Sequence, residues 1–339
     1  MNSLEKYIEK VFSDKLVSNL AIKVGTGNTA LYETYRSDEE RIDGHTLFDM
    51  ASITKILATT TLCLIAADKG LLDFNTSVTK FFGKNSDKQS MTVFHLLTHT
   101  TGVSPKGLNI PGINNDNISD YILNIPYEIP LGSEVMYNCQ GFILLGKILE
   151  KVFNERLDIL FRNFVCDPLG MKKTTFCPCD KINIVNSNLS ESEIGVVNDP
   201  NSRHLGGVAG NAGIFSNVSD LTKYIQMLIK EGQPIISKTA FNQAVKNHTS
   251  HLSESRGLGF LYVDDRYKQT GGLFSDGSFG HCGHTGQSFF VDPKSGLYVI
   301  ILSDATISTV KKYGKENYEE VVKMRSDIHN AIKCDLQKI

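Results

Sequence analysis

The chain has 339 residues, of which 41% are hydrophobic and 21% charged, with a formal net charge of −2. This composition predicts a globular protein with a substantial core, and the near-neutral charge argues against nucleic acid as a partner. No run of 18 apolar residues is present, so we expect no membrane span, and seven cysteines without framework spacing fit reduced thiols in the cytoplasm.

The first predicted element is an N-terminal amphipathic helix. Its apolar residues recur at helical spacing among charged ones, which argues against a secretory signal. These residues are Leu4, Tyr7, Ile8, Val11 and Phe12. Two strands are expected next, at 20–24 and 30–35, joined by a glycine-containing turn at 25–27.

The middle of the chain, from about residue 48 to 166, has a mainly helical pattern. Helical segments are expected at 52–69, 93–98, 118–123 and 141–152. A loop-rich region follows, with the glycine-rich stretch 205–213 at its centre. Strand patterns then return at 258–263, 288–291 and 297–302, and a charged amphipathic helix at 316–332 closes the chain.

This order of elements predicts an α/β fold of the α+β type. Terminal strands and helices surround a helical insert, which favours an antiparallel sheet flanked by terminal helices plus an all-α subdomain. Residues 1–47 together with 215–339 would form the sheet subdomain, and 48–214 the mainly helical one, within one domain overall. The cleft between these two parts is the expected ligand site.

Ser52 and Lys55 begin the apolar segment 52–69 and are three residues apart, so a helix places both on one face. A serine hydroxyl is a poor nucleophile until a neighbour takes its proton, and a neutral lysine can do that. The spacing alone is weak support, because the chain contains it four times. The other three pairs are Ser3/Lys6, Ser77/Lys80 and Ser308/Lys311.

Two further motifs carry candidate site residues. Tyr137 and Cys139 lie directly before the helical pattern at 141–152. The glycine-rich stretch 279–288 leads into a strand and offers two registers of the pattern H-x-G, one beginning at His281 and one at His284. Glycines beside a strand allow another group to approach the backbone closely.

With S-x-x-K, a variant of Y-x-N and H-x-G in this order, the chain resembles the serine beta-lactamase and penicillin-binding-protein superfamily. The resemblance is to its class C-like branch of esterases and D-amino-acid peptidases, and it runs from about residue 20 to 332. Connecting phrases at 95–102, 168–171 and 206–216 match as well. The resemblance implies a beta-lactamase/transpeptidase-like fold without cofactor or metal, and it favours His281 over His284 as the functional histidine.

The resemblance also implies the roles of the site residues. Ser52 would attack a carbonyl to form an acyl-enzyme, Lys55 would take its proton, and Tyr137 would relay protons to the leaving group. The backbone N–H groups of Ser52 and of His284, which follows Gly283, would form the oxyanion hole. A free lysine titrates at about 10.4, so we expect burial and a neighbouring cation to lower the pKa of Lys55 towards about 7.

Two departures from the family pattern bear on the substrate. Cys139 stands where an asparagine often grips an acylamino side chain, and a thiol is a weak hydrogen-bonding group. His281 replaces the usual lysine and is only partly charged near neutral pH. Together with the absent signal sequence, these changes favour a small ester or amide in the cytoplasm, with an ester preferred. The alternatives are a true class C-like beta-lactamase or D-amino-acid peptidase, and an acylated binding or sensor protein without turnover.

Other residues receive weaker interpretations. The thiols of Cys166, Cys177 and Cys179 lack the spacing and the histidines of a zinc site, so no metal site is predicted. His95 and His99 are expected to pack rather than react, and Gln140 could offer an amide near Cys139. Asp199 and His204 are expected near the cleft without a chemical role, and the loop 206–213 should pass close to a bound acyl group. The oligomeric state stays open.

Overall fold

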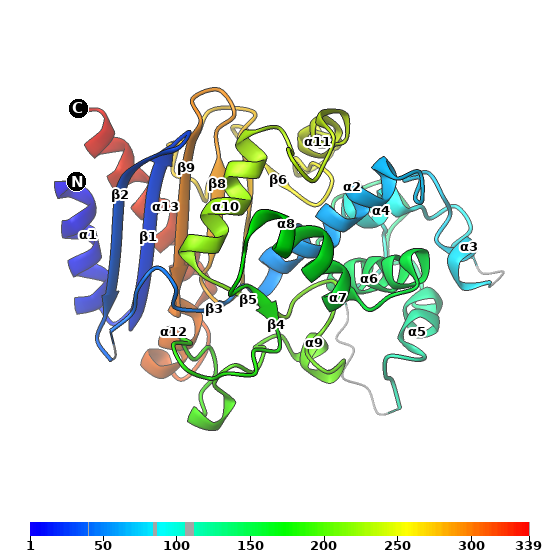
Figure 1. Cartoon of the computed structure of the whole chain (residues 1–339), viewed down its shortest axis with the longest axis horizontal. Coiled ribbons are helices and arrows are strands. Elements are labelled where there is room, and N and C mark those ends of the chain that lie inside the picture. The colour runs from blue at the N-terminus through cyan, green and yellow to red at the C-terminus, as the bar shows by residue number, and fades with distance from the viewer. Residues whose placement is uncertain (40, 84–86, 106–111, 339) are drawn as a thin grey trace.

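A six-stranded antiparallel sheet forms the centre of the structure, a computed structural model that describes residues 1–39, 41–83, 87–105 and 112–338. The strand order is β2-β1-β9-β8-β7-β6, so the N-terminal hairpin pairs with the last strand of the chain (Figure 1). The strands are β1 (Asn19–Thr26), β2 (Thr29–Ser37), β6 (Leu261–Tyr262), β7 (Phe279–Cys282), β8 (Ser288–Val291) and β9 (Leu297–Ser303).

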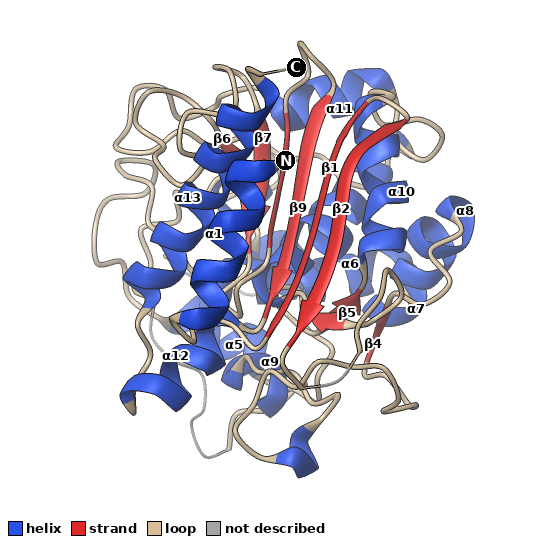
Figure 2. Ribbon diagram, turned by 90° about the vertical axis from the view of Figure 1, so that its left-hand side faces the viewer, coloured by secondary structure: helices blue, strands red, loops and turns tan. Residues whose placement is uncertain are grey.

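The two terminal helices, α1 (Asn2–Ser13) and α13 (Tyr318–Leu336), pack against each other and against one face of this sheet (Figure 2). Because successive side chains of a strand point to opposite faces, Leu20, Ile22 and Val24 of β1 join the core beneath these helices. The predicted terminal helices and the antiparallel sheet are confirmed.

Helix α10 (Val218–Ile229) covers the opposite face of the sheet, and the helical part of the molecule lies beyond it (Figure 1). A short sheet of β3 (Phe48–Asp49), β5 (Ile214–Ser216) and β4 (Thr175–Phe176) lies between the two parts. The remaining α-helices are α2 (Thr61–Asp68), α3 (Thr79–Phe82), α4 (Val93–Leu97), α5 (Ile118–Asn124), α6 (Cys139–Phe153), α7 (Leu157–Phe161), α8 (Asp167–Leu169), α9 (Pro200–His204), α11 (Lys238–Val245) and α12 (Ala305–Tyr313).

The stretch Ala51–Asp68 is central to the helical part, and its backbone changes type along its length. A 3₁₀ turn η1 (Ala51–Ile53) is followed by a π-helical turn η2 (Lys55–Thr60) and then by α2. In the described part of the chain this is the one helical stretch long and apolar enough to span a membrane, with a mean hydropathy of 1.3 over 18 residues. Because 83% of it is buried inside the protein, it also has the character of a core helix.

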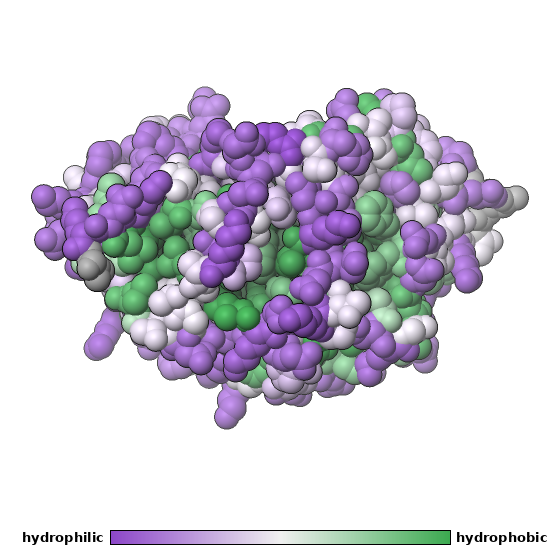
Figure 3. Space-filling view, turned by 90° about the horizontal axis from the view of Figure 1, so that it is seen from above, coloured by the Kyte–Doolittle hydropathy of each residue, from purple (hydrophilic) through white to green (hydrophobic). Residues whose placement is uncertain are grey.

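The structure differs from the predicted elements where tertiary contacts, more than the local sequence pattern, determine which strands and helices form. The strand expected at 258–263 is reduced to the two residues of β6, and β7, α10, α11, α12 and the short sheet were not predicted. The division into two subdomains stays a prediction, and α11 packs on α2 across it. Seen from above, polar residues cover most of the surface and hydrophobic residues appear in separate patches between them (Figure 3).

Candidate active site

Ser52 sits on a tight backbone turn between β3 and the core helix, which we call the serine turn (residues 49–53). Ala51, the residue before it, has a left-handed φ of +46°. A left-handed residue other than glycine costs about 1–3 kcal/mol and persists only where its surroundings hold it. The serine hydroxyl is therefore presented by a strained turn at the start of a buried helix.

Three of the predicted site residues meet at the serine oxygen. Lys55 Nζ donates a hydrogen bond to Ser52 Oγ over 2.9 Å, and Tyr137 Oη donates to the same oxygen over 2.7 Å. Lys55 is fully buried, and its ammonium also donates to the Asn211 carbonyl over 3.0 Å and lies 3.6 Å from Cys139 Sγ. The structure thus brings together Ser52, Lys55, Tyr137 and Cys139.

Tyr137 is held by the beginning of α6. The Asn138 side chain caps this helix by accepting the Gly141 N–H over 2.9 Å, as asparagine does at N-caps. The His99 ring packs on the Tyr137 ring with centroids 4.5 Å apart, and the His99 carbonyl accepts the Met136 N–H over 2.8 Å. His99 therefore packs against the site, in agreement with its predicted structural role.

The two histidines of the H-x-G stretch face different surroundings. His281 is buried on β7, with its ring centroid 6.2 Å from that of Tyr137. The His284 side chain is 45% exposed, and its Nε2 lies 3.2 Å from Glu316 Oε2. The structure therefore places His281, rather than His284, beside Tyr137, as the first register predicts.

Gly283 brings the backbone after β7 against the serine turn. A Cβ at this position would lie 2.7 Å from the Met50 carbonyl oxygen, so only glycine allows this approach. No residue in the described ranges accepts a hydrogen bond from the backbone N–H of His284, and the Ser52 N–H lies in the first turn of a helix, where it has no partner within the helix. Both amides are thus available to an oxyanion.

The charge state of Lys55 differs from the expectation. Burial disfavours the ammonium, but its electrostatic interactions with Cys139 and Tyr137 and the hydrogen bond of Tyr137 raise the pKa of Lys55 above its ordinary value. The predicted lowering towards about 7 is therefore wrong for the resting site. The physical reason is that carbonyl, hydroxyl and thiol groups surround the amine, where the prediction required a cation.

The buried histidines are neutral. Burial, assisted by the charges of Arg256 and Lys55, holds the pKa values of His281 and His99 well below the usual range. His281 Nδ1 lies 2.7 Å from the Cys282 carbonyl, and none of the described residues hydrogen-bonds to its Nε2. His281 consequently supplies a neutral ring, without a positive charge, at the place where the family usually has a lysine.

Ser52 and Tyr137 lie where two hollows meet. A cleft of about 1060 Å³, the large cleft, opens on one side, and a cavity of about 310 Å³ lies on the other. His284 lines both. The large cleft also carries Cys139, Asn188, Leu189, Glu193, Asn198, Asp199, Arg203, His204, Ile307 and Val310. The smaller cavity carries Arg256, Tyr267, Gln269, His281 and Tyr318 among others.

Some site residues were not found from the sequence. The Asn211 carbonyl fixes Lys55, so the glycine-rich loop holds the lysine itself. Arg256, whose guanidinium lies 5.5 Å from the Tyr137 ring centroid, also escaped notice. No local pattern could identify either, because both contacts join distant segments. The suggestion for Gln140 was wrong, since it lines an internal cavity of about 10 Å³ instead of the cleft.

The cysteines outside the site are free thiols. Cys177 and Cys179 are exposed, whereas Cys166 is buried. Across the described ranges, no three His, Cys, Asp or Glu side chains gather as a metal site would require.

Comparisons with known proteins agree on one family. The sequence profile named Beta-lactamase matches residues 5–322. A relative from Salmonella enteritidis, provisionally named a D-alanyl-D-alanine carboxypeptidase, is 26% identical over 316 residues, covering 80% of this chain and 72% of the relative.

Solved structures share the fold. EstCE1, described as a hydrolase with promiscuous acyltransferase activity, superposes with a TM-score of 0.79 at 16% identity, and 98% of each chain is covered. A beta-lactamase/D-alanine carboxypeptidase from Yersinia pestis, in complex with citrate, gives a TM-score of 0.76 at 19% identity, covering 98% of this chain and 97% of the other. These likenesses confirm the predicted fold class.

Proposed function

Because this chain belongs to the beta-lactamase family, we propose that it is a serine hydrolase that acts through an acyl-enzyme and prefers small esters. The observation that carries this proposal is the convergence of Lys55 Nζ and Tyr137 Oη on Ser52 Oγ at 2.9 and 2.7 Å. A nucleophile within hydrogen-bond reach of two proton-transfer groups is the arrangement that covalent catalysis needs.

Acylation would proceed after the Lys55–Tyr137 pair has lost one proton. Ser52 Oγ attacks the ester carbonyl carbon while its proton passes to the Lys55 amine. The negative oxygen of the tetrahedral intermediate accepts hydrogen bonds from the Ser52 and His284 N–H groups. The C–O bond to the alcohol then breaks, and the departing oxygen takes the proton through Tyr137. In the second half of the reaction, water attacks the acyl carbonyl and gives a proton to the Lys55–Tyr137 pair. The bond to Ser52 Oγ then breaks, the serine oxygen takes the proton back, and the acid is released.

Two features support an ester over a beta-lactam or peptide. The Cys139 thiol beside Lys55 offers no primary amide to grip an acylamino group. The neutral His281 ring gives a substrate carboxylate no charged partner at the H-x-G position. The large cleft adds the apolar side chains of Leu189, Ile307 and Val310, which suit an uncharged acyl or alcohol group.

Purified protein should be assayed with p-nitrophenyl acetate, p-nitrophenyl butyrate, nitrocefin and a D-alanyl-D-alanine peptide, with Ser52→Ala as the blank. We expect ester turnover to exceed the others clearly, and a fluorophosphonate probe to label the native protein but not Ser52→Ala. Nitrocefin turnover equal to ester turnover would contradict the ester preference. Labelling of Ser52→Ala would contradict the nucleophile.

A D-amino-acid peptidase or beta-lactamase is the second candidate, because the Salmonella relative carries a carboxypeptidase name. The same substrate panel separates it from an esterase. An acylated sensor without turnover would instead give a stable acyl adduct by mass spectrometry and no steady-state product.

A further inference from the structure

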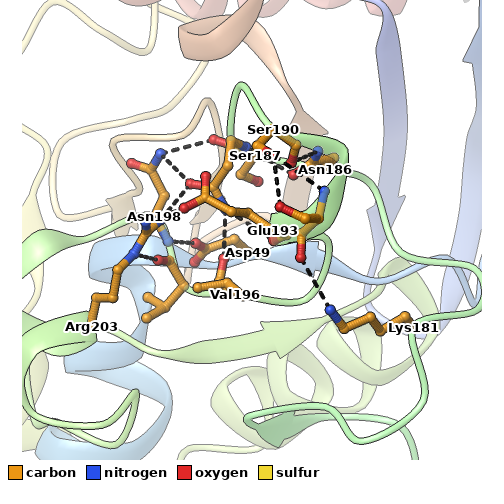
Figure 4. A network of polar contacts seen from close by, with 12 residues as sticks. Asp49, Lys181, Asn186, Ser187, Ser190, Glu193, Val196, Asn198 and Arg203 are labelled. Atoms are coloured by element: carbon orange, nitrogen blue, oxygen red, sulfur yellow. Dashed lines mark hydrogen bonds and ion pairs between the residues drawn. The ribbon is translucent and has the colours of Figure 1, made fainter.

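Asp49 is a buried carboxylate at the base of the serine turn, without a part in the chemistry described above. It is completely buried at the end of β3. Its Oδ1 accepts the N–H of Ala51 over 2.8 Å. Its Oδ2 accepts the N–H of Asn198 over 2.7 Å (Figure 4). The first bond holds the left-handed residue that precedes Ser52.

The second bond reaches the wall of the large cleft. We call residues 186–203 the cleft-wall loop, since Asn188, Glu193 and Asn198 all line the cleft. Arg203 crosslinks this loop, because its guanidinium donates to Asn188 Oδ1 over 2.7 Å and to Glu193 Oε1 over 2.6 Å. The side chain of Asn198 donates to the Ser187 carbonyl over 2.8 Å (Figure 4). The loop is therefore braced internally, and Asp49 joins it to the serine turn.

The backbone of Asp49 makes a third connection. Its carbonyl oxygen accepts the Thr285 hydroxyl and the Gln287 side-chain amide, each over 2.8 Å. Thr285 immediately follows His284, whose N–H is one of the two free amides at the site, and Gln287 lies three positions after it. Residue 49 thus links the serine turn, the cleft-wall loop and the backbone of the oxyanion site.

We propose that Asp49 is a positioning residue that sets the geometry of Ser52 by tying the serine turn to the cleft-wall loop. The inference deepens the proposed function and rests on Ser52 being the nucleophile. Two backbone N–H groups need one acceptor each, and an ionised carboxylate satisfies both with its two oxygens. A neutral group at this position leaves one N–H poorly bonded and releases the strained Ala51.

The charges around Asp49 determine where it titrates. Burial, together with the nearby Asp199 carboxylate, raises its pKa to about 6, while the two backbone N–H groups and Arg203 oppose this change. Arg203 is itself paired with Glu193, and Thr285 and Gln287 are uncharged. As the pH falls through about 6, Asp49 gains a proton, and the protonated oxygen becomes a poor acceptor for its N–H.

The unmodified protein already tests the proposal through the rate at which a fluorophosphonate labels Ser52. Above about pH 6 Asp49 is ionised and the rate follows the loss of one proton from the Lys55–Tyr137 pair, so the logarithm of the rate should rise with a slope of one. Below about pH 6 the protonation of Asp49 should increase the slope to two. Circular dichroism at each pH would check that the protein stays folded. A slope of one down to pH 5 in folded protein, together with native labelling by Asp49→Asn, would overturn the proposal.

Variants give an independent test with a matched control. Asp335 likewise accepts two backbone N–H groups, of Ser3 and Leu4 over 3.0 and 2.9 Å, but joins the terminal helices far from the cleft. We expect Asp49→Asn to label about 100-fold more slowly, as a misplaced reacting group does, and to keep a slope of one below pH 6. Asp49→Glu, which keeps the carboxylate, should recover part of the rate and the steeper slope.

Asp335→Asn should stay within about twofold of the native labelling rate, even if both asparagine variants melt earlier. Equal rates for Asp49→Asn and Asp335→Asn would reduce Asp49 to a purely structural role and overturn the inference. Failure of the proposed function is recognised separately, because it would appear as labelling of Ser52→Ala.

Discussion

At the scale of single residues, the site depends on how protons are distributed between Lys55, Tyr137 and Cys139. Desolvation raises the pKa of the Tyr137 phenol, although the Lys55 charge opposes it, and the pKa of Lys55 is raised as well. At neutral pH an ammonium and a phenol therefore both donate to Ser52 Oγ. One proton has to leave this pair before Lys55 can accept the serine proton, so activity should increase with pH.

Replacing Cys139 tests this distribution. Among the groups that raise the pKa of Lys55, Cys139 has the largest effect, so Cys139→Ala should lower the pKa of Lys55. The rising part of the pH profile of kcat/KM should then move to lower pH. Cys334→Ala, which removes an exposed thiol on α13, should leave the profile unchanged. The role given to the thiol would fail if both variants had the native profile.

At the scale of elements, the start of α6 positions Tyr137. Asn138 caps the helix through the Gly141 N–H, and its side-chain amide donates to Thr101 Oγ1 and the Val103 carbonyl over 3.1 Å each. The cap therefore fixes both the helix end and the loop behind it. Tyr137 directly precedes this cap, so the cap holds its backbone at the place from which its hydroxyl reaches Ser52.

Removing this cap should affect stability and activity together. Asn138→Ala should reduce the free energy of unfolding by about 1–2 kcal/mol and lower kcat, because Tyr137 loses its support. Asn217→Ala is the matched control, since Asn217 caps α10 by accepting the Asp220 N–H on the face of the sheet away from the terminal helices. Asn217→Ala should reduce the free energy of unfolding by a similar amount, measured by urea denaturation, and should keep the native kcat. An equal loss of kcat in both variants would contradict the positioning of Tyr137 by its cap.

At the scale of the whole molecule, two cores support the site. One lies between the sheet and the terminal helices, and the other joins the opposite face of the sheet to the helical part. Ser52 and Tyr137 come from the helical part and His281 from the sheet. The site therefore lies at the junction that the second core holds together.

Weakening the terminal core should reduce stability without changing the chemistry. Ile8 of α1 is only 2% exposed, so Ile8→Ala should reduce the free energy of unfolding by about 2–5 kcal/mol, measured by urea denaturation. The folded variant should keep native kcat/KM at low temperature. Glu9→Ala, on the exposed face of the same helix, should change stability by less than about 0.5 kcal/mol. A loss of kcat/KM in fully folded Ile8→Ala would show that the terminal core shapes the site.

The sequence by itself determined the features that depend on near neighbours. Helical spacing identified α1 and α13, apolar runs bounded by turn residues identified β1, β8 and β9, and the three-residue spacing placed Ser52 and Lys55 on one face. These patterns are local, because the spacing of apolar residues within a single helix or strand shows which of its faces a core will bury. The order of three motifs added the family and, through it, Tyr137 and His281.

Only the tertiary structure decided what depends on residues distant in the sequence. The Asn211 carbonyl holds Lys55 from 156 positions away, and Asp49 accepts the N–H of Asn198 from 149 positions away. The direction of the Lys55 pKa was mispredicted for the same reason, because the pKa of a buried group follows the charges and dipoles that the fold assembles around it. Sequence spacing carries no record of those neighbours.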